Sequence, residues 1–513
     1  MKRTVKTVGG MVLAVGLAFL AAAPPAVANN ITVTNVALVN QSTAGKTVEV
    51  QFDLSWQNSW RDTENWDAAW VFVKFEEAGL PTNNWQHALL STSGHTPAAN
   101  STIAVGTNDA SGVGLGAFVY RNAAYTGDVS YANMRLLWNY GSNGYAFAKG
   151  ASVVVSVQAI EMVHVPQGAF AAGSGGTEST CFTLTTINTG NATVAPSGSG
   201  SLGGQAGGYP TGQTAPNNAS WPNGYNAFYC MKYELTQGQY RDFLNMLTRA
   251  QQSTRTASQA ANNYAMGGTG SIQNRESIRC PAVIPGTGTN IVFGCDWNNN
   301  GVFNEPGDGM DRAGNFISWS DGCAYAAWAG LRPMTELEFE KACRGPATPV
   351  ANEYAWGNAT APTVLTSENN DGYGTSTASP ANANGQIAGG PSGPCRVGIF
   401  ATVSSTRAQA GASYWGIMEL SGNLWERPVN IGSANGRLFT GSNGSGVLDA
   451  NGRATNTDWN TDGAGSDASG VGIRGGSWLS AASDARVSDR VYAGFAITSR
   501  AGNVTLRAVR GAP

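Results

Sequence analysis

The chain has 513 residues, a formal net charge of −3 and only 12% charged residues. A net charge this close to zero gives no electrostatic basis for binding nucleic acid or an anionic membrane surface. The 67 glycines and 15 tryptophans indicate a folded protein rich in loops and β-structure, because a disordered chain would lack the aromatic residues. A chain of this length has too many residues for one hydrophobic core, which predicts two or three domains.

Residues 1–28 have the pattern of a secretory signal peptide. The basic start Met1-Lys2-Arg3 precedes an apolar run, Met11–Ala23, and the small-residue motif Ala26-Val27-Ala28. The apolar run is too short to span a bilayer, and no later stretch approaches the roughly 20 apolar residues that a spanning helix needs. We therefore expect cleavage near Ala28 and a secreted protein, extracellular or periplasmic, with no membrane span.

The seven cysteines are expected to lie in an oxidising compartment, because the protein is predicted to be secreted. Pairing is favoured there, and the odd count leaves at least one thiol free or intermolecular. Cys280 and Cys295 bracket a short Pro/Gly-rich loop and are the expected disulfide pair. No Cys-x-x-Cys motif occurs, which argues against a zinc ribbon or a thioredoxin-like site.

Residues 29–159 are predicted to form a separate all-β domain. Apolar residues alternate with polar ones from Val48 to Trp56, the pattern of a strand with one wet face. Six or seven such strands over this length are typical of a β-sandwich. The other expected strands are Ile31–Val39, Ala69–Phe75, Gly116–Arg121, Met134–Asn139 and Ser152–Ala159.

Six tryptophans in this region have two possible roles. Exposed tryptophans can form a stacking platform for sugars, whereas most tryptophans of a sandwich lie in its core. The six are Trp56, Trp60, Trp66, Trp70, Trp85 and Trp138.

From residue 160 the pattern changes to few helices separated by long loops. Thr236 and Gln239 form a capping box before a helix, and Thr335 and Glu338 form another. A further helix, Asp321–Ala329, is expected with Ser320 as its N-cap and Gly330 just past its end. Residues 250–312 are predicted to be a looped insertion.

Six sequence blocks resemble the formylglycine-generating enzyme (sulfatase-modifying factor) family and occur in the family's order. They are Met231–Thr236, Arg332–Glu340, Ala355–Asn358, Gly422–Glu426, Arg474–Trp478 and Leu506–Arg510. The resemblance implies a C-type-lectin-like domain over residues 160–513. The expected fold class is therefore α+β, with the all-β sandwich domain preceding this domain.

The resemblance also places the family's two copper-binding cysteines at Ser480 and Ala485. Thiolates suit copper(I), whereas a hydroxyl and a methyl group do not. A second branch of the family uses histidine-bound iron, but the three histidines here are split between the two regions and do not resemble one metal site. We expect neither copper nor iron.

A structural calcium site is implied by the resemblance at Glu419, Gly422, Leu424 and Glu426. Carboxylate and backbone oxygens are a hard ligand set that suits Ca²⁺. The alternative is that Glu426 makes hydrogen bonds in the core.

A second calcium candidate is Asp296, Asn298 and Asn300, which match the first half of an EF-hand loop. Gly307 stands where the bidentate glutamate would be, so this is not a true EF-hand; Asp308 or Glu305 could close a nonstandard loop. An Asn-rich turn is the alternative.

The segment after Arg474–Trp478 lines the ligand face in binding proteins of this fold. By that resemblance the candidate ligand-binding residues are Trp478, Ser480, Arg486, Asp489, Arg490 and Tyr492, although the two arginines could instead form internal ion pairs. The predicted function is a secreted, non-catalytic binding or structural protein with an unknown protein or glycan ligand. The alternative is an oxidoreductase of the same superfamily with an altered active site.

Overall fold

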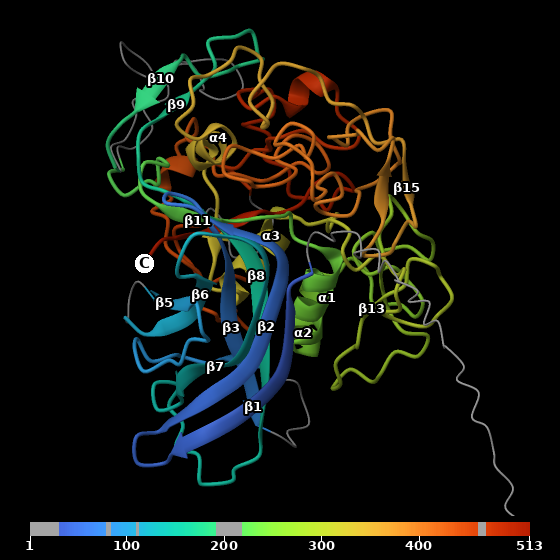
Figure 1. The fold of residues 1–513 in the computed structure, drawn as a ribbon. Coiled ribbons are helices and arrows are strands. Elements are labelled where there is room, and N and C mark those ends of the chain that lie inside the picture. Colours follow the sequence, from blue (N-terminus) through green and yellow to red (C-terminus); the bar gives the residue numbers. More distant parts are fainter. Residues whose placement is uncertain (1–29, 78–83, 109–111, 191–217, 460–467) are drawn as a thin grey trace, which may run out of the picture.

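The computed structural model describes residues 30–77, 84–108, 112–190, 218–459 and 468–513. The predicted signal peptide lies outside these residues. The described N-terminal strands all belong to two antiparallel sheets (Figure 1). They are β1 (Thr32–Ser42), β2 (Thr47–Arg61), β3 (Asp67–Glu77), β4 (Gln86–His87), β5 (Ser101–Thr107), β6 (Gly114–Arg121), β7 (Tyr125–Asn139) and β8 (Val153–Val165).

The described residues of the rest of the chain are dominated by loops, with short strands and four α-helices. No helix among the described residues is long and apolar enough to cross a membrane. The strands are β9 (Phe170–Ala172), β10 (Thr185–Ile187), β11 (Phe228–Met231), β12 (Ile278–Arg279), β13 (Gly294–Cys295), β14 (Arg332–Pro333), β15 (Ser367–Asn369), β16 (Thr377–Ser379) and β17 (Ala508–Gly511). The helices are α1 (Gln237–Asn245), α2 (Arg249–Arg255), α3 (Trp319–Trp328) and α4 (Glu336–Arg344), with 3₁₀ turns at Gly436–Leu438 and Ala482–Ala485.

The alternating residues of β2 build one layer of the N-terminal core. Val50, Phe52 and Leu54 are buried in one apolar cluster with Val71 and Val73 of β3. The three-stranded sheet β1-β2-β7 therefore packs on a face of the larger sheet. Each fully buried large apolar side chain of this kind stabilises the fold by about 1.5–3 kcal/mol.

One eight-stranded sheet joins the N-terminal strands to the remainder of the chain. Its order is β14-β17-β11-β8-β3-β6-β5, with β4 attached to β3. The domain boundary predicted at residue 160 falls inside β8, which pairs with β3 on one side and with β11 on the other. Trp70 of β3 also donates a hydrogen bond to the carbonyl of Ala329, 2.8 Å away.

The helix caps mostly follow local sequence. Thr236 caps α1 and Thr335 caps α4, each in the predicted capping box, and Gly330 adopts a left-handed φ of 71° just after α3. The prediction of Ser320 as the N-cap of α3 is wrong. Ser318 is the cap because its hydroxyl pairs with Asp321 at the N3 position.

The predicted insertion 250–312 is not wholly looped. It contains most of α2, which Thr248 and Gln251 begin with a further capping box, and the hairpin β12–β13. With its mostly antiparallel sheets and few short helices, the protein has an α+β fold.

Candidate functional site

The signature Arg474–Trp478 is anchored in the interior by buried ion pairs. Arg474 contacts Glu336 at 3.0 Å and Glu340 at 2.9 Å, both on α4, and is fully buried. Arg490 also pairs with Glu336, at 3.0 Å. Burial alone would raise the pKa of Glu340, but Arg344 and Arg474 hold it below its usual value. These pairs fix the segment from Arg474 to Arg490 against α4.

Ser480 and Ala485 lie in a filled part of the structure. The Ser480 hydroxyl accepts a hydrogen bond from the Ser477 amide at 3.0 Å, and it lies 3.0 Å from the Ser477 hydroxyl. Ala485 is 0% exposed and packs in a cluster with Tyr354 and Trp356. A β-carbon on Gly476 would lie only 3.0 Å from that of Ala485. The two positions therefore do not line an open cavity.

The candidate ligand-binding residues do not gather on one exposed face. Trp478, Ser480, Asp489 and Arg490 are buried, and Trp478 donates from its indole nitrogen to the Gly502 carbonyl at 3.0 Å. Asp489 accepts from the amides of Ser179 and Val491. Arg486 is half-buried beside Asn352, at 3.3 Å, and Tyr492 is 40% exposed against Trp425. Only Arg486 and Tyr492 of the six are substantially open to solvent.

Three buried carboxyl groups, including that of Glu426 itself, lie in or beside the Gly422–Glu426 block. Glu234 accepts from the Leu424 amide at 3.0 Å, and Glu426 pairs with Arg507 at 2.6 Å. Glu419 accepts from the Gly398 amide at 2.7 Å and adopts a left-handed φ of 55°, an unusual conformation for this residue type. One oxygen of Glu419 and one of Glu426 are buried without a hydrogen-bond partner. Burial raises the pKa of Glu419 to about 7, and the nearby Glu426 carboxylate adds to this effect.

The Asp296 loop curls around its own side-chain oxygens. Asp296 and Asn298 both accept from the Asn300 amide, at 3.1 and 2.9 Å, and Asp296 also forms an ion pair with Arg279. Asp308 is fully buried and has one carboxylate oxygen without a partner. Burial raises the pKa of Asp308, with Asp296 and Glu305 contributing in the same direction. The structure thus brings Asp308 to the loop formed by the three predicted residues.

The three histidines do not form one site, because each has a different set of neighbours. His87 lies 3.0 Å from the Lys74 ammonium, and His95 accepts from the Leu137 amide at 3.0 Å. His164 stacks on Trp66 with ring centroids 3.8 Å apart. Across the described ranges, no three His, Cys, Asp or Glu side chains group so that they could hold a metal ion. The candidate site at Glu419 and Glu426 has only two such side chains, because its other two candidate ligands are backbone oxygens.

The predicted Cys280–Cys295 disulfide is wrong in this structure, where all seven cysteines are free. Cys295 lies opposite Ile278 in the β12–β13 hairpin, so the ladder does not place the two cysteines as a directly opposed pair. The short separation of the two cysteines along the chain did not predict how strands β12 and β13 pair.

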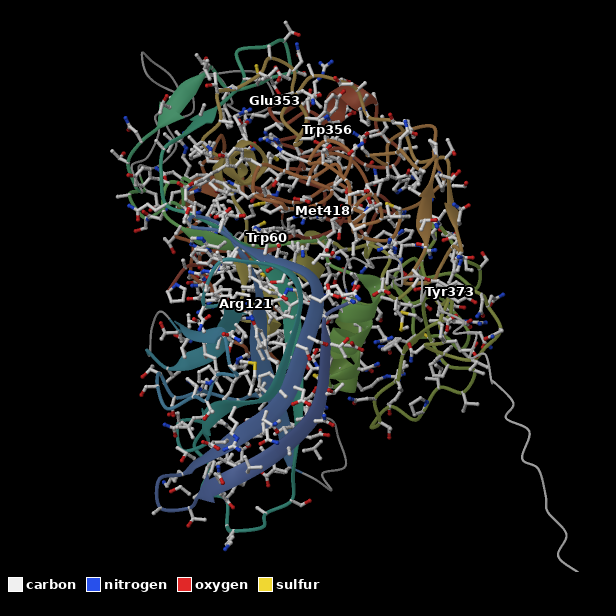
Figure 2. The ribbon with its side chains drawn as sticks, viewed as in Figure 1. Trp60, Arg121, Glu353, Trp356, Tyr373 and Met418 are labelled. Carbon is white, nitrogen blue, oxygen red and sulfur yellow. The ribbon has the colours of Figure 1, made fainter. Side chains whose placement is uncertain are left out.

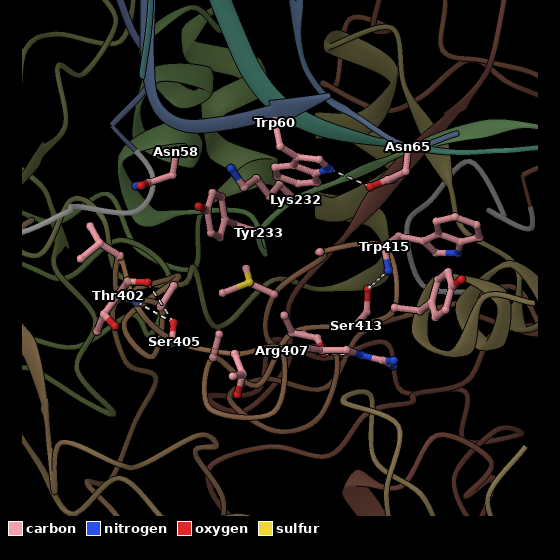
Figure 3. Close-up of a pocket in the computed structure, with 18 residues that line it drawn as sticks. Asn58, Trp60, Asn65, Lys232, Tyr233, Thr402, Ser405, Arg407, Ser413 and Trp415 are labelled. Atoms are coloured by element: carbon pink, nitrogen blue, oxygen red, sulfur yellow. Dashed lines mark hydrogen bonds between the residues drawn. The ribbon is translucent and has the colours of Figure 1, made fainter. Parts of the chain in front are cut away.

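A cavity of about 420 Å³ lies at the junction of the two regions, and no local sequence pattern predicted it (Figure 3). Trp60 and Lys232 line one side, and the loop 401–418 lines the other. Figure 2 places Trp60 and Met418, which both line the cavity, where the strands meet the loop-rich half. Of the six N-terminal tryptophans, Trp56, Trp70 and Trp138 are core residues, while Trp60 is half-buried at the cavity.

The loop-rich C-terminal part of the fold and the buried Arg474–Trp478 signature together define a protein of the sulfatase-modifying-factor type. The chain matches the family described as "Sulfatase-modifying factor enzyme 1-like domain" over residues 151–512 and belongs to that family.

Several characterised proteins are similar over part of the chain. Hercynine oxygenase of Mycobacterium tuberculosis is 36% identical over 117 residues, which is 23% of this chain and 21% of that protein. The formylglycine-generating enzyme of Bos taurus is 30% identical over 146 residues, covering 27% of this chain and 35% of that protein. The M. tuberculosis formylglycine-generating enzyme is 32% identical over 147 residues, covering 26% and 39%. The matches thus span well under half of these relatives' own lengths.

Among solved structures, Treponema denticola variable protein 1 aligns with a TM-score of 0.30 and 12% sequence identity. The alignment covers 71% of this chain and 98% of that protein.

Proposed function

We propose that this protein is a secreted, non-catalytic binding or structural protein built on the sulfatase-modifying-factor scaffold. The observation that carries the proposal is the packing at Ser480 and Ala485. Neither side chain is a thiol, and the Ala485 methyl group is enclosed by a filled apolar cluster. Copper(I) needs soft ligands, and these two groups supply none.

The remaining cysteines do not supply an alternative thiolate site. Burial raises the pKa of all seven thiols, which disfavours the free thiolate at each of them. The thiolate rather than the thiol binds metal and attacks substrate. The separated histidines likewise argue against the iron chemistry of the oxidoreductase alternative, although the relatives named above are enzymes.

Calcium is proposed as the stabilising ion at Glu419, Gly422, Leu424 and Glu426. Two buried carboxylate oxygens without partners fit a divalent cation, because leaving such groups unpaired costs free energy. Glu419 and Glu426 would supply these oxygens, and Gly422 and Leu424 would supply backbone carbonyls. The two unpartnered oxygens support the ion, while the ion pair between Glu426 and Arg507 opposes it, since a bound cation would compete with that arginine.

A second calcium site is proposed at Asp296, Asn298 and Asn300, closed by Asp308. The buried, unpartnered oxygen of Asp308 supports this assignment over a simple Asn-rich turn. The ion pair between Asp296 and Arg279 opposes it, since a bound cation would compete with that arginine.

The finer fold assignment is also part of the proposal: a β-sandwich followed by a C-type-lectin-like domain. Secretion after cleavage near Ala28 completes it. Arg486 and Tyr492 are the members of the predicted ligand face that a partner could reach.

The decisive experiment measures bound metals and redox activity in the purified secreted protein. We expect calcium by mass spectrometry, no stoichiometric copper or iron, and no oxidation of a cysteine-containing peptide with or without added copper. The Ser480→Cys/Ala485→Cys double variant is the matched control, because it restores the missing thiols at the same positions. Stoichiometric copper or iron with peptide oxidation by the unmodified protein would overturn the proposal.

Calcium is tested separately by thermal unfolding in chelator. Removal of the ion should lower the melting temperature, and Glu419→Gln should reduce that effect. An unchanged melting temperature on chelation and on calcium return would rule out a stabilising calcium ion.

A further inference from the structure

We propose that the cavity between the end of β2 and loop 401–418 binds a neutral sugar residue of a glycan. This inference deepens the proposed binding function and rests on it. The volume of about 420 Å³ lies within the range of roughly 300–1,000 Å³ that is usual for small-molecule sites. Neither Ser480 nor Ala485 lines this cavity.

One wall of the cavity is aromatic and rigidly held. Trp60 donates from its indole nitrogen to Asn65 at 2.7 Å, and the Asn65 amide donates to the His164 carbonyl at 2.7 Å. Tyr233 continues the wall beside Trp60 (Figure 3), and Met418 also lines the cavity. The negative π-faces of such rings attract the weakly positive C–H bonds of a pyranose.

The lining disfavours a cationic ligand. The Lys232 ammonium lies 5.0 Å from the Trp60 ring centroid and 5.5 Å from that of Tyr233, so it already interacts with both rings. No aspartate or glutamate lines the cavity within the described part of the chain.

An anionic ligand is disfavoured for a complementary reason. Lys232 is paired with Glu161 at 3.0 Å and Asp67 at 3.4 Å. The Arg407 guanidinium donates to the carbonyls of Ala355 and Ala412, at 2.6 and 3.3 Å, and extends away from Trp60 in Figure 3. The Lys232 charge is therefore paired with two carboxylates, and the Arg407 guanidinium is held by backbone carbonyls, so a neutral ligand fits best.

The polar groups at the cavity distinguish a sugar from an apolar ring. The side-chain amide of Asn58 and the hydroxyl of Thr402 line the cavity and make no hydrogen bond with other described residues, whereas the Asn58 backbone amide donates to Asp128 at 3.0 Å. Asn58 has a left-handed φ of 53° at an irregularity in the pairing of β2 with β7, a feature that re-aims side chains beside binding sites. An apolar ligand would leave these groups without partners as it excluded water, whereas sugar hydroxyls would pair with them.

The test uses the full secreted chain on an array of neutral, sialylated and sulfated glycans, followed by titration calorimetry with the best neutral oligosaccharide. Trp60→Ala and the double variant Asn58→Ala/Thr402→Val should each weaken binding at least tenfold. Trp85→Ala is the matched control, because Trp85 is also half-buried but lines a different cavity of about 200 Å³. It should bind as the unmodified protein does.

Three results would overturn the inference: no glycan bound by the folded protein, preference for the sialylated or sulfated glycans, or binding lost in Trp85→Ala but kept in the Asn58/Thr402 variant. The double variant changes only two side chains without internal hydrogen bonds, so it tests the site even if Trp60→Ala fails to fold. Failure here would leave the non-catalytic proposal intact, because that proposal is decided by metal content and peptide oxidation.

Discussion

Replacing His164 by phenylalanine should remove a pH-dependent loss of stability. Burial lowers the pKa of His164 from 6.5 to about 4, with Arg61 and Lys341 adding to this shift. The unfolded chain therefore binds a proton at this residue between about pH 6.5 and 4 while the folded protein does not. Stability is fully present above pH 6.5 and falls as the pH is lowered through this window, by about 3 kcal/mol in total.

The assay is urea unfolding followed by tryptophan fluorescence at intervals from pH 7.5 to pH 4. His164→Phe keeps an aromatic ring against Trp66, 3.8 Å away in the native stack, but cannot bind a proton. At pH 7.5 His164 is neutral, so the two proteins should differ only by the contact of His164 Nδ1 with the Glu64 carbonyl, 3.3 Å away, which phenylalanine lacks. At pH 4 the variant should be more stable by about 3 kcal/mol relative to that baseline. A difference between the two proteins that does not change with pH would refute the reasoning.

Three further predictions concern the interior. Arg490→Met leaves Glu336 with one of its two buried arginine partners and should cost about 3–5 kcal/mol in urea unfolding; a loss below about 1 kcal/mol would contradict the anchoring role. Gly476→Ala should cost about 1–3 kcal/mol, because Gly476 has a φ of 77° and lies against Ala485; unchanged stability would argue against tight packing there. Alkylation of the denatured, unreduced protein should modify both Cys280 and Cys295 in peptide mass spectra, whereas a peptide linked through the two would restore the disulfide.

The features predicted well from sequence are those set by neighbouring residues. Thr236 and Thr335 begin their helices because each cap reaches only three residues along the chain. The same rule could have found Ser318, with Asp321 at N3, and Thr248, with Gln251 at N3. Those two errors came from applying a local signal incompletely.

The cavity and the continuous sheet could not be predicted in this way. Trp60, Lys232 and Thr402 are separated by well over a hundred residues, and only tertiary packing brings them to one cavity. Similarly, alternation in β8 identifies a strand but not its pairing with β11. Placing the ligand-face residues also required the structure, since the burial of Arg490 depends on its pairing with α4.

The pairing of β8 with β11 has a consequence for dividing the protein. Residues 30–190 and 218–513, produced as separate polypeptides, would each carry one side of a ladder that joins Val165 to Phe228 and Met162 to Met231. Each piece alone would expose an unpaired strand edge and would tend to aggregate. Produced together, the two pieces should reassemble through this ladder, which makes the protein suited to fragment complementation rather than to isolation as independent domains.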